Sequence, residues 1–490
     1  MSQINTAPSL AKYPLVQRIF EDSKRGGEPK SEEYEPSLTS EQVADRLTRS
    51  SNRWPDSNRN GTAEMTFEFS TAEPGLFAEV KDHDKKQAIK EFLPLTPRQQ
   101  AFVRKAQQEY SDVANITFTE APRGSGEGHL TYNGYSTGDQ PSGVRGFAFM
   151  RKPQNEQHQG AVWMRHVDQE SDFGGYDDNA GEDAWRQNFT HELGHGLGLE
   201  HPFSDKDEKP ELADYGENWS NYTVMSNNSA SLSDNEEEDV RPVSLMVDDV
   251  TAIQSLYGAN YATRSGDTTY GFNSNTERDH LSLKTAEDKP TFTVWDGGGW
   301  DTLDFSKFSQ NQTINLNAGS FSQVGGLLNN VSIAHGVTIE EAKGGKGKNI
   351  LIGNNAFNVL RGGPNSDILF GGSGGAQMWG GKGANTFVFD TSSSGKANWV
   401  MDFTSGKDKL DFSGLRQQLG PLNFVSTLPH DHSKAQDPLS PTFITRPGDV
   451  LVTYDAAFQR THFRIDTTGN GKMDMHIDVQ GSVAREDVVV

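Results

Sequence analysis

The stretch HELGHGLGLEHP, residues 191–202, decides the fold of this chain. It contains three histidines, and His191 and His195 are four positions apart. On a helix this spacing places both side chains on one face, one turn above the other. Two neutral imidazoles in that arrangement bind one Zn²⁺, and Gly198 allows the sharp turn that returns His201 as a third ligand. The stretch therefore predicts a metal-binding helix that ends near Gly198.

Three protein ligands leave the fourth position of a tetrahedral zinc for water, which is typical of a catalytic site and not of a structural one. Glu192 lies beside His191 and is expected to reach that water as a general base, so that a hydroxide attacks a carbonyl polarised by the same metal. The alternative is an ordinary core helix that happens to carry histidines. The fixed offsets of Gly198 and His201 argue against it.

The extended pattern H-E-x-x-H-x-x-G-x-x-H resembles the metzincin metalloproteases. Those enzymes also carry a methionine turn beneath the zinc, and NYTVMSNN, residues 221–228, offers Met225 for that position. Alone, a methionine in a polar loop indicates only packing. Together with the histidine pattern it supports the resemblance.

Patterns around the motif predict mixed helices and strands. LTPRQQAFVRKAQQEYSDVA, residues 95–114, has helical spacing of apolar residues, with Thr96 as the expected N-cap. NITFTEA at 115–121, RGFAFM at 145–150 and GAVWMR at 160–165 have the composition of strands. The motif helix is expected to start near Asp183 as its cap. Residues 1 to about 40 are polar without strong periodicity, which indicates an extension or a removable leader.

After Tyr257 the chain changes to short β-prone segments separated by Gly, Asn and Asp. A nine-residue repeat follows: GGKGKNILI, GNNAFNVLR, GGPNSDILF, GGSGGAQMW and GGKGANTFV, residues 344–388. Each unit joins a glycine-rich turn to a short strand, which is typical of a parallel β-roll whose units bury a face only by stacking. A disordered linker, the alternative, does not explain the regular apolar positions: Ile350, Ile352, Val359, Ile368, Phe370 and Phe387.

The remaining sequence resembles the serralysins, secreted bacterial zinc endopeptidases, over nearly the whole chain from about residue 36. The resemblance rests on SDVANITFTE, QNFTHELGHGLGLEHP, GDTTYGFNSNTERD, WDGGGWDTLDFS and the long segment 310–340. It implies an α+β metzincin catalytic domain followed by an all-β C-terminal domain, a calcium-binding parallel β-roll with a β-sandwich-like cap. The expected boundaries are a propeptide or leader at 1–20, the catalytic domain at 21–258, and the β-roll and secretion domain at 259–490.

The resemblance also implies several Ca²⁺ ions besides one Zn²⁺. The expected calcium ligands combine backbone oxygens with carboxylates, and they are Arg264, Gly266, Thr268, Asp296, Gly298, Gly299, Asp301, Thr338, Glu340 and Asp367. Within the repeats, Asp367 occupies the ligand place of the G-G-x-G-x-D pattern. Asn349, Ala376 and Asn385 occupy the equivalent places, and Asn365 replaces a glycine. We therefore expect fewer or weaker calcium ions in the repeats. DTTGNGKMD, residues 466–474, has calcium-loop composition, but such segments are common between strands and a turn is the favoured interpretation.

One position departs from the family in the catalytic domain. Serralysins usually have a tyrosine two positions after the turn methionine that helps to stabilise the tetrahedral intermediate. Asn227 stands there in this chain. Loss of one such donor typically lowers turnover by about 10²–10³, so we expect a protease with reduced activity or altered specificity.

Composition limits the class of partner. The net charge of −23 disfavours nucleic acid and anionic membranes, and no apolar run reaches the roughly 20 residues of a membrane span. The chain has no cysteine and no basic-then-apolar N-terminal pattern, so no Sec signal is expected. By resemblance, REDVVV at the end, with Asp487 before three valines, suggests an uncleaved type I secretion signal and an extracellular location.

The leading hypothesis is a monomeric secreted zinc endopeptidase of broad specificity acting on protein substrates. The resemblance to the serralysins implies two further partners, the type I secretion apparatus and a periplasmic protein inhibitor. Two alternatives stay open: a low-activity protease-like protein that acts mainly by binding a protein target, and a purely structural calcium-roll adhesin. The adhesin hypothesis leaves the three-histidine motif without a purpose.

Overall fold

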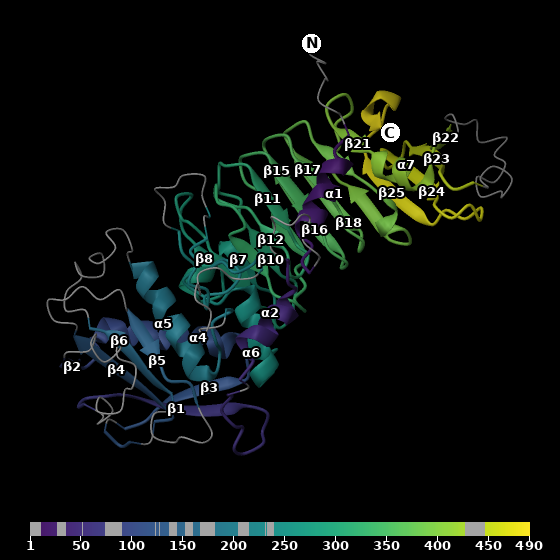
Figure 1. Cartoon of the computed structure of the whole chain (residues 1–490). Helices are drawn as coiled ribbons and strands as arrows, with labels where there is room; N and C mark the ends of the chain where they lie inside the picture. The colour runs from purple at the N-terminus through teal and green to yellow at the C-terminus, as the bar shows by residue number, and fades with distance from the viewer. Residues whose placement is uncertain are drawn as a thin grey trace, which may run out of the picture. The chain divides into compact units, whose positions relative to one another are not determined.

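The computed structural model describes most of the chain, and the ranges it describes are 11–26, 36–50, 52–73, 91–122, 124–126, 128–136, 145–151, 160–166, 182–203, 215–230, 232, 240–426 and 446–490. The chain forms two compact units (Figure 1). The first, here called the histidine unit, comprises residues 25–265 and 291–297. The second, called the strand unit, comprises residues 1–24, 266–290 and 298–490.

The histidine unit mixes helices and strands. Its described helices are α2 (Ser40–Leu47), α4 (Pro97–Val113), α5 (Glu182–Leu197) and α6 (Val247–Tyr257). Its described strands are β1 (Ala63–Phe69), β2 (Glu91–Leu93), β3 (Ile116–Glu120), β4 (Leu130–Ser136), β5 (Gly146–Ala148), β6 (Ala161–Arg165) and β9 (Phe292–Val294).

One sheet organises this unit, with the strand order β3-β1-β4-β6-β5 and β2 paired to β4. The pairs β1–β3, β1–β4 and β4–β6 are parallel, whereas β5 runs antiparallel to β6 and forms an edge of the described sheet. Helices α4 and α5 pack on each other, and α5 also packs on β5 and β6 (Figure 1). The Phe102 and Phe189 rings, 5.9 Å apart, join the two helices. The helix that carries the histidines is thus held in the core.

Local patterns predicted these elements well. Thr96 caps α4 through a capping box with Gln99, as expected from its sequence. The strand predictions at 115–121, 145–150 and 160–165 are confirmed by β3, β5 and β6. One detail was wrong: α5 already includes Glu182, so Asp183 lies within the first turn and is not the cap. An acidic residue is favourable in either place because the helix N-terminus is partly positive.

The strand unit is almost entirely β-structure. Its strands through the repeats are β7 (Thr269–Phe272), β8 (Ser282–Leu283), β10 (Thr302–Asp304), β11 (Gln312–Asn315), β12 (Phe321–Ser322), β13 (Val331–Ile333), β14 (Glu341–Lys343), β15 (Asn349–Ile352), β16 (Asn358–Gly363), β17 (Ile368–Phe370), β18 (Ala376–Gly381), β19 (Thr386–Val388), β20 (Ala397–Val400) and β21 (Lys409–Asp411). The C-terminal strands are β22 (Asn423–Ser426), β23 (Asp449–Asp455), β24 (Arg460–Asp466), β25 (Met475–Gln480) and β26 (Val488–Val489). Its described helices are α1 (Tyr13–Asp22) and α7 (Ser413–Leu419), with short 3₁₀ turns at Asp279–Leu281, Thr391–Ser393 and Arg485–Asp487.

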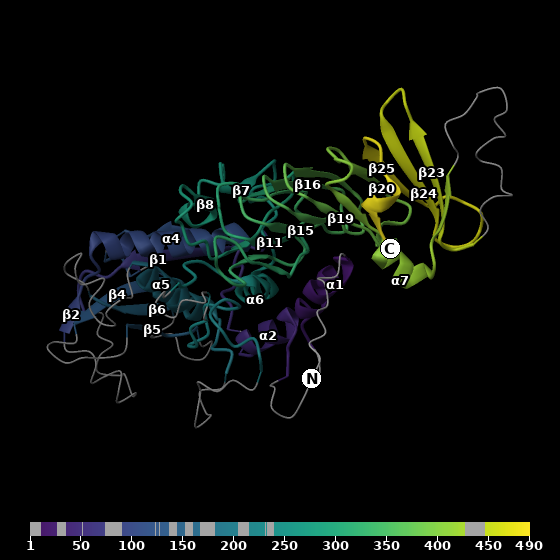
Figure 2. The ribbon, with the colours of Figure 1, turned by 90° about the horizontal axis from the view of Figure 1, so that it is seen from above.

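Consecutive strands from β14 to β21 alternate between two sheets, and each pairs in parallel with the strand two positions along the chain (Figure 2). Side chains that face the space between the sheets form the core, for example Leu351, Leu360 and Leu369, each 0% exposed. The repeat of nine residues corresponds to one turn plus one strand. Within the described ranges, no helix is both long and apolar enough to cross a membrane.

The first forty residues were expected to lack regular structure, and this is wrong for α1. Tyr13 and Val16 are buried against Ile352, Phe370 and Val388 on one sheet of the repeats. Their spacing of three is helical, but the apolar stripe is short and polar residues dominate the segment around it. The helix is stabilised chiefly by the sheet it covers. The leader predicted at 1–20 includes most of this helix.

The C-terminal strands β23, β24 and β25 are antiparallel, and β25 joins the repeat sheet through a parallel pairing with β20. The 466–474 segment forms the turn between β24 and β25, where Asp466 accepts the backbone N–H groups of Gly469 and Gly471 at 2.6 and 2.8 Å. These bonds favour the turn interpretation over the calcium loop.

Candidate metal centre and its surroundings

Helix α5 places the two motif histidines on one face, and its end places the third. Gly198 has φ +103°, a conformation that an L side chain rarely adopts, and a Cβ there would lie 2.8 Å from Asn52 O. The Leu199 N–H donates to Gly194 O at 2.8 Å and ends the helix. Gly198 thus ends the helix as expected, and the chain turns back to bring His201 over α5.

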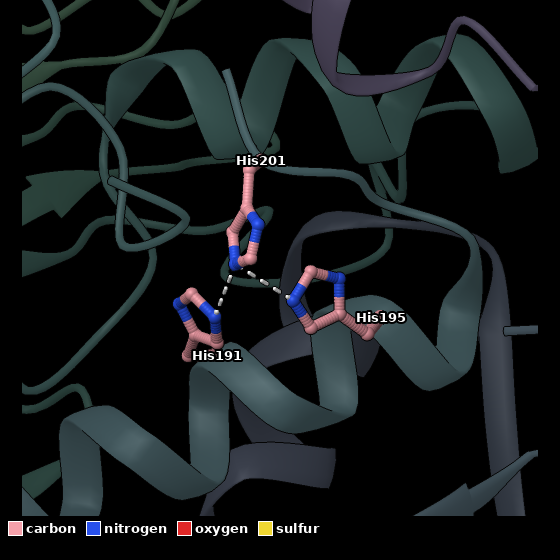
Figure 3. Close-up of side chains that lie close together, drawn as sticks. All are labelled: His191, His195 and His201. Atoms are coloured by element: carbon pink, nitrogen blue, oxygen red, sulfur yellow. Dashed lines mark hydrogen bonds between the residues drawn. The ribbon is translucent and has the colours of Figure 1, made fainter. Parts of the chain in front are cut away.

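The three imidazoles meet at their Nε2 atoms (Figure 3). The Nε2 of His201 lies 3.2 Å from that of His195 and 3.3 Å from that of His191. Three tetrahedral ligands with Zn–N bonds of about 2.0–2.1 Å have nitrogens about 3.3 Å apart. The two distances from His201 therefore match the spacing of zinc ligands, and all three ligand nitrogens lie within 4.8 Å of one another.

Hydrogen bonds on the opposite side of the rings fix their orientation. The Nδ1 of His191 lies 2.7 Å from Val224 O, and the Nδ1 of His195 lies 2.7 Å from Leu199 O. When each Nδ1–H donates to its carbonyl, the Nε2 lone pair points toward the shared centre. Burial, together with the nearby His201, lowers the pKa of His191 to about 4. This half-buried ring is therefore neutral, as a metal ligand must be, in mildly acidic solution.

Glycine at two positions makes room for the functional side chains. A Cβ on Gly194 would lie 2.8 Å from the sulfur of Met225. Met225 is 0% exposed, so the glycine lets it pack directly on the helix that carries the histidines. A Cβ on Gly146 in β5 would lie 3.0 Å from Cγ of Glu192. Glu192 is thus a buried carboxylate, 8% exposed, that lies between α5 and the edge strand.

A buried aspartate that the sequence did not single out holds the methionine turn. Asp249, 0% exposed, accepts hydrogen bonds from Thr223 Oγ1 at 2.6 Å, Val224 N at 2.8 Å and Met246 N at 2.9 Å. The carbonyl of the same Val224 holds His191. Burial raises the pKa of Asp249 to about 7. An acidic residue in the first turn of a predicted helix indicates only a favourable interaction with the helix dipole. The sequence therefore gave no reason to single out Asp249.

Asn227, the remaining predicted residue near the metal centre, is exposed and follows the methionine turn. Its neighbours Ser226 and Asn228 bond to Asn218, which fixes the backbone on both sides of it.

The predicted calcium ligands belong to both units. In the histidine unit, Asp296 is 4% exposed, and Arg264, with φ +48°, directs its guanidinium to Trp295 O and to Asp112. In the strand unit, Asp301 Oδ1 accepts the Thr268 N–H at 2.8 Å, and the Asp301 N–H donates to Glu340 at 2.7 Å.

The structure thus brings together three of the predicted calcium ligands in the strand unit: Thr268, Asp301 and Glu340. Four others, Gly266, Gly298, Gly299 and Thr338, are exposed. Asp367 is 1% exposed and lies within the stacked repeats.

Comparison with known proteins agrees with this geometry. Residues 259–490 match the family described as Peptidase M10 serralysin C terminal. The chain is 42% identical to Metallopeptidase AprA of Pseudomonas marginalis, over 99% of this chain and 98% of the relative. It is 41% identical to Serralysin of Photorhabdus luminescens, over 78% and 77%, and 37% identical to Serralysin B of Dickeya chrysanthemi, over 93% and 91%.

The chain belongs to the serralysin family. Relatives that are about 40% identical over most of their length share an enzyme class, so the chain is a zinc metalloendopeptidase. The family resemblance inferred from the histidine motif and the repeats is confirmed.

Proposed function

We propose that this serralysin is a secreted endopeptidase of broad specificity that uses one zinc ion held by His191, His195 and His201. The observation that carries the proposal is the convergence of three Nε2 atoms whose Nδ1 partners are fixed. Zinc bound there supplies a water of lowered pKa and a Lewis acid for the scissile carbonyl. Neutral imidazoles and a low-lying pKa at His191 suit this role.

Glu192 is the residue proposed to accept the proton of the attacking water. It follows His191 directly, so the same helix positions both groups, and its burial restricts the carboxylate to few orientations. A general base typically contributes about 10²–10⁴ in rate. Met225 supports the histidines from beneath, as its contact with Gly194 suggests.

The C-terminal part, 259–490, is proposed to be a parallel β-roll with a β-sandwich-like cap, and the N-terminal part, 21–258, a metzincin catalytic domain. The alternating parallel pairing of β14 to β21 supports the β-roll. Calcium is proposed at the start of this region, around Asp301 and Glu340, and Asp296 is proposed as a further calcium ligand. Export by type I secretion and a leader within 1–20 complete the proposal.

A second function rests on one residue. Asn227 stands where the family resemblance places a tyrosine, so a low-activity protein that binds its target without rapid cleavage is the competing proposal. Both proposals expect zinc to bind, but only the first expects hydrolysis.

A casein assay separates the two. Wild type and Glu192→Ala are purified, loaded with zinc and calcium, and shown to hold equal zinc by elemental analysis. The enzyme proposal expects wild type to cleave casein and the variant to be slower by at least about 10². Equal, background-level clearance by both proteins would favour the binding protein.

A further inference from the structure

The turns of the repeats at 344–349, 362–367 and 380–385 stack along one edge of the strand unit, and Asn349 stands where a cation ligand is expected. Its Nδ2 lies 3.1 Å from Gly345 O, 3.0 Å from Gly347 O and 2.8 Å from Asp367 Oδ1. In a calcium-binding repeat, turn carbonyls and a neighbouring carboxylate converge in this way on the metal. Here the same three oxygens converge on an amide nitrogen.

The other groups of Asn349 are also satisfied by protein atoms. Its Oδ1 accepts the Gly345 N–H at 2.9 Å and the Gln312 Nε2 at 3.1 Å, and its own N–H donates to Asp367 Oδ1 at 2.7 Å. The residue is 1% exposed. A Ca²⁺ within about 2.3–2.6 Å of those carbonyls would face amide hydrogens, which repel it. The donor set at this turn therefore does not fit calcium.

The pattern continues to the next two turns. Asn385 Oδ1 accepts the Asp367 N–H at 3.0 Å, and the Asn385 N–H donates to Asp408 Oδ1 at 2.8 Å. Its Nδ2 again faces its own turn carbonyls, at 3.4 Å from Gly381 O and from Gly383 O. Asparagine and aspartate thus alternate as Asn349, Asp367, Asn385 and Asp408, each bonded to the next turn.

The opposite row of turns has one asparagine at the aspartate place, Asn358, whose Nδ2 donates to Ile339 O at 3.1 Å. Asn354, at a glycine place of the same turn, also donates its Nδ2 to Ile339 O, at 2.8 Å. The Asn354 N–H donates to Asn358 Oδ1 at 2.8 Å. The next equivalent place holds Ala376, which has no side-chain oxygen.

Within the described residues, the Oδ2 atom of Asp367 has no hydrogen-bond partner, and this oxygen is buried. It is a single oxygen, whereas Ca²⁺ takes about six to eight. The neighbouring Gly363 carbonyl already accepts the Lys382 N–H at 3.1 Å. Asp367 alone is therefore not sufficient for a calcium site.

We propose that residues 344–390 of this chain use a ladder of asparagine amides and aspartates in place of calcium, so that this region is folded and protected without Ca²⁺. Each amide N–H₂ takes the position of a cation between turn carbonyls. The proposal concerns the repeats alone and does not depend on the peptidase activity or on calcium near Asp301.

Hydrogen exchange on the full-length chain tests the proposal, with Glu192→Ala as background to suppress self-cleavage. Peptides from 344–390 are compared in EGTA and in Ca²⁺. The expected result is protection that changes by less than about two-fold. A loss of ten-fold or more in EGTA, about 1.4 kcal/mol, confined to this region, would overturn the proposal.

A gain-of-site variant gives the second measurement. Asn349→Asp removes the amide donor and leaves two carbonyls and two carboxylates facing one another, so one additional Ca²⁺ should bind and protection at 344–367 should become calcium-dependent. Asn355→Asp is the matched control, because it adds the same charge at an exposed position of the turn at 353–358, in the opposite row. The proposal would also be overturned if the Asn349→Asp protein binds no more Ca²⁺ than the control and keeps its protection from hydrogen exchange in EGTA.

Discussion

Replacing Asp249 tests whether a residue that is not itself a proposed metal ligand supports the metal centre. Asp249→Ala leaves the N–H groups of Val224 and Met246 and the Thr223 hydroxyl without their acceptor in a fully buried place. Each such loss costs about 1–3 kcal/mol, partly offset because a buried carboxylate is removed, so we expect a net loss of about 3–5 kcal/mol in the free energy of unfolding. Because the Val224 carbonyl holds His191, zinc affinity should fall by about 10–100-fold.

Asp249→Asn is the matched control for the same site. Its oxygen can still accept the two N–H groups, and its N–H₂ can donate to Thr223, so the loss should stay within about 1 kcal/mol near pH 5. The pH dependence of stability distinguishes the aspartate from the asparagine variant. Since the folded pKa of Asp249 is raised from 3.8 to about 7, the unfolded chain holds fewer protons between these values and wild-type stability falls as pH rises, by up to about 4 kcal/mol.

The assays are thermal or urea unfolding from pH 4 to 8 and zinc affinity by competition with a chelator. The Asn variant should gain in stability relative to wild type across this range, because it has no carboxyl group to ionise. If Asp249→Ala unfolds like wild type and binds zinc with the same affinity, the support role of this aspartate is refuted.

Three further predictions follow from other parts of the molecule. Asn227→Tyr should raise kcat on casein, by up to about 10², and an unchanged kcat at equal zinc content would show that the residue is not part of the site. Val16→Ala, in the buried face of α1, should lower the free energy of unfolding by about 1.5–3 kcal/mol, whereas Leu15→Ala on the exposed side should be neutral. Equal melting temperatures for these two variants would contradict the packing role of α1. Hydrogen bonds from Ser405, Gly406 and Ala484 lower the pKa of Asp487, so the stability that this carboxylate contributes is present above pH 4 and is lost as pH falls. Asp487→Ala should therefore make the free energy of unfolding depend less on acid pH. An acid unfolding curve identical to that of wild type would contradict this role of Asp487.

Local patterns predicted which candidate site residues the structure brings together, because these residues are contained in a short stretch. His191, Glu192 and His195 lie on one helix, and Gly198 fixes the turn that brings back His201, so spacing alone was enough to propose the ligand set. The contacts of Met225 and Asp249 were beyond such reasoning. They depend on how α6 and the methionine turn pack against α5, and that packing joins residues far apart in sequence.

The repeats show a similar limit. The glycine and apolar spacing predicted stacked strands, and the replacement of aspartate by asparagine predicted weaker calcium binding. The direction of each amide could not be predicted, because Asn349 can present either Oδ1 to a metal or Nδ2 to carbonyls. Helix α1 was missed for a related reason, since its short apolar stripe is stabilised by a sheet formed more than three hundred residues later.

The most direct test of the central claim is a zinc titration of the metal-free protein followed by casein hydrolysis. The three-histidine centre predicts that activity rises with added zinc and saturates at one equivalent per chain, while Glu192→Ala takes up the same equivalent without gaining activity. Activity in the metal-free protein, or equal activity in the zinc-loaded variant, would contradict it.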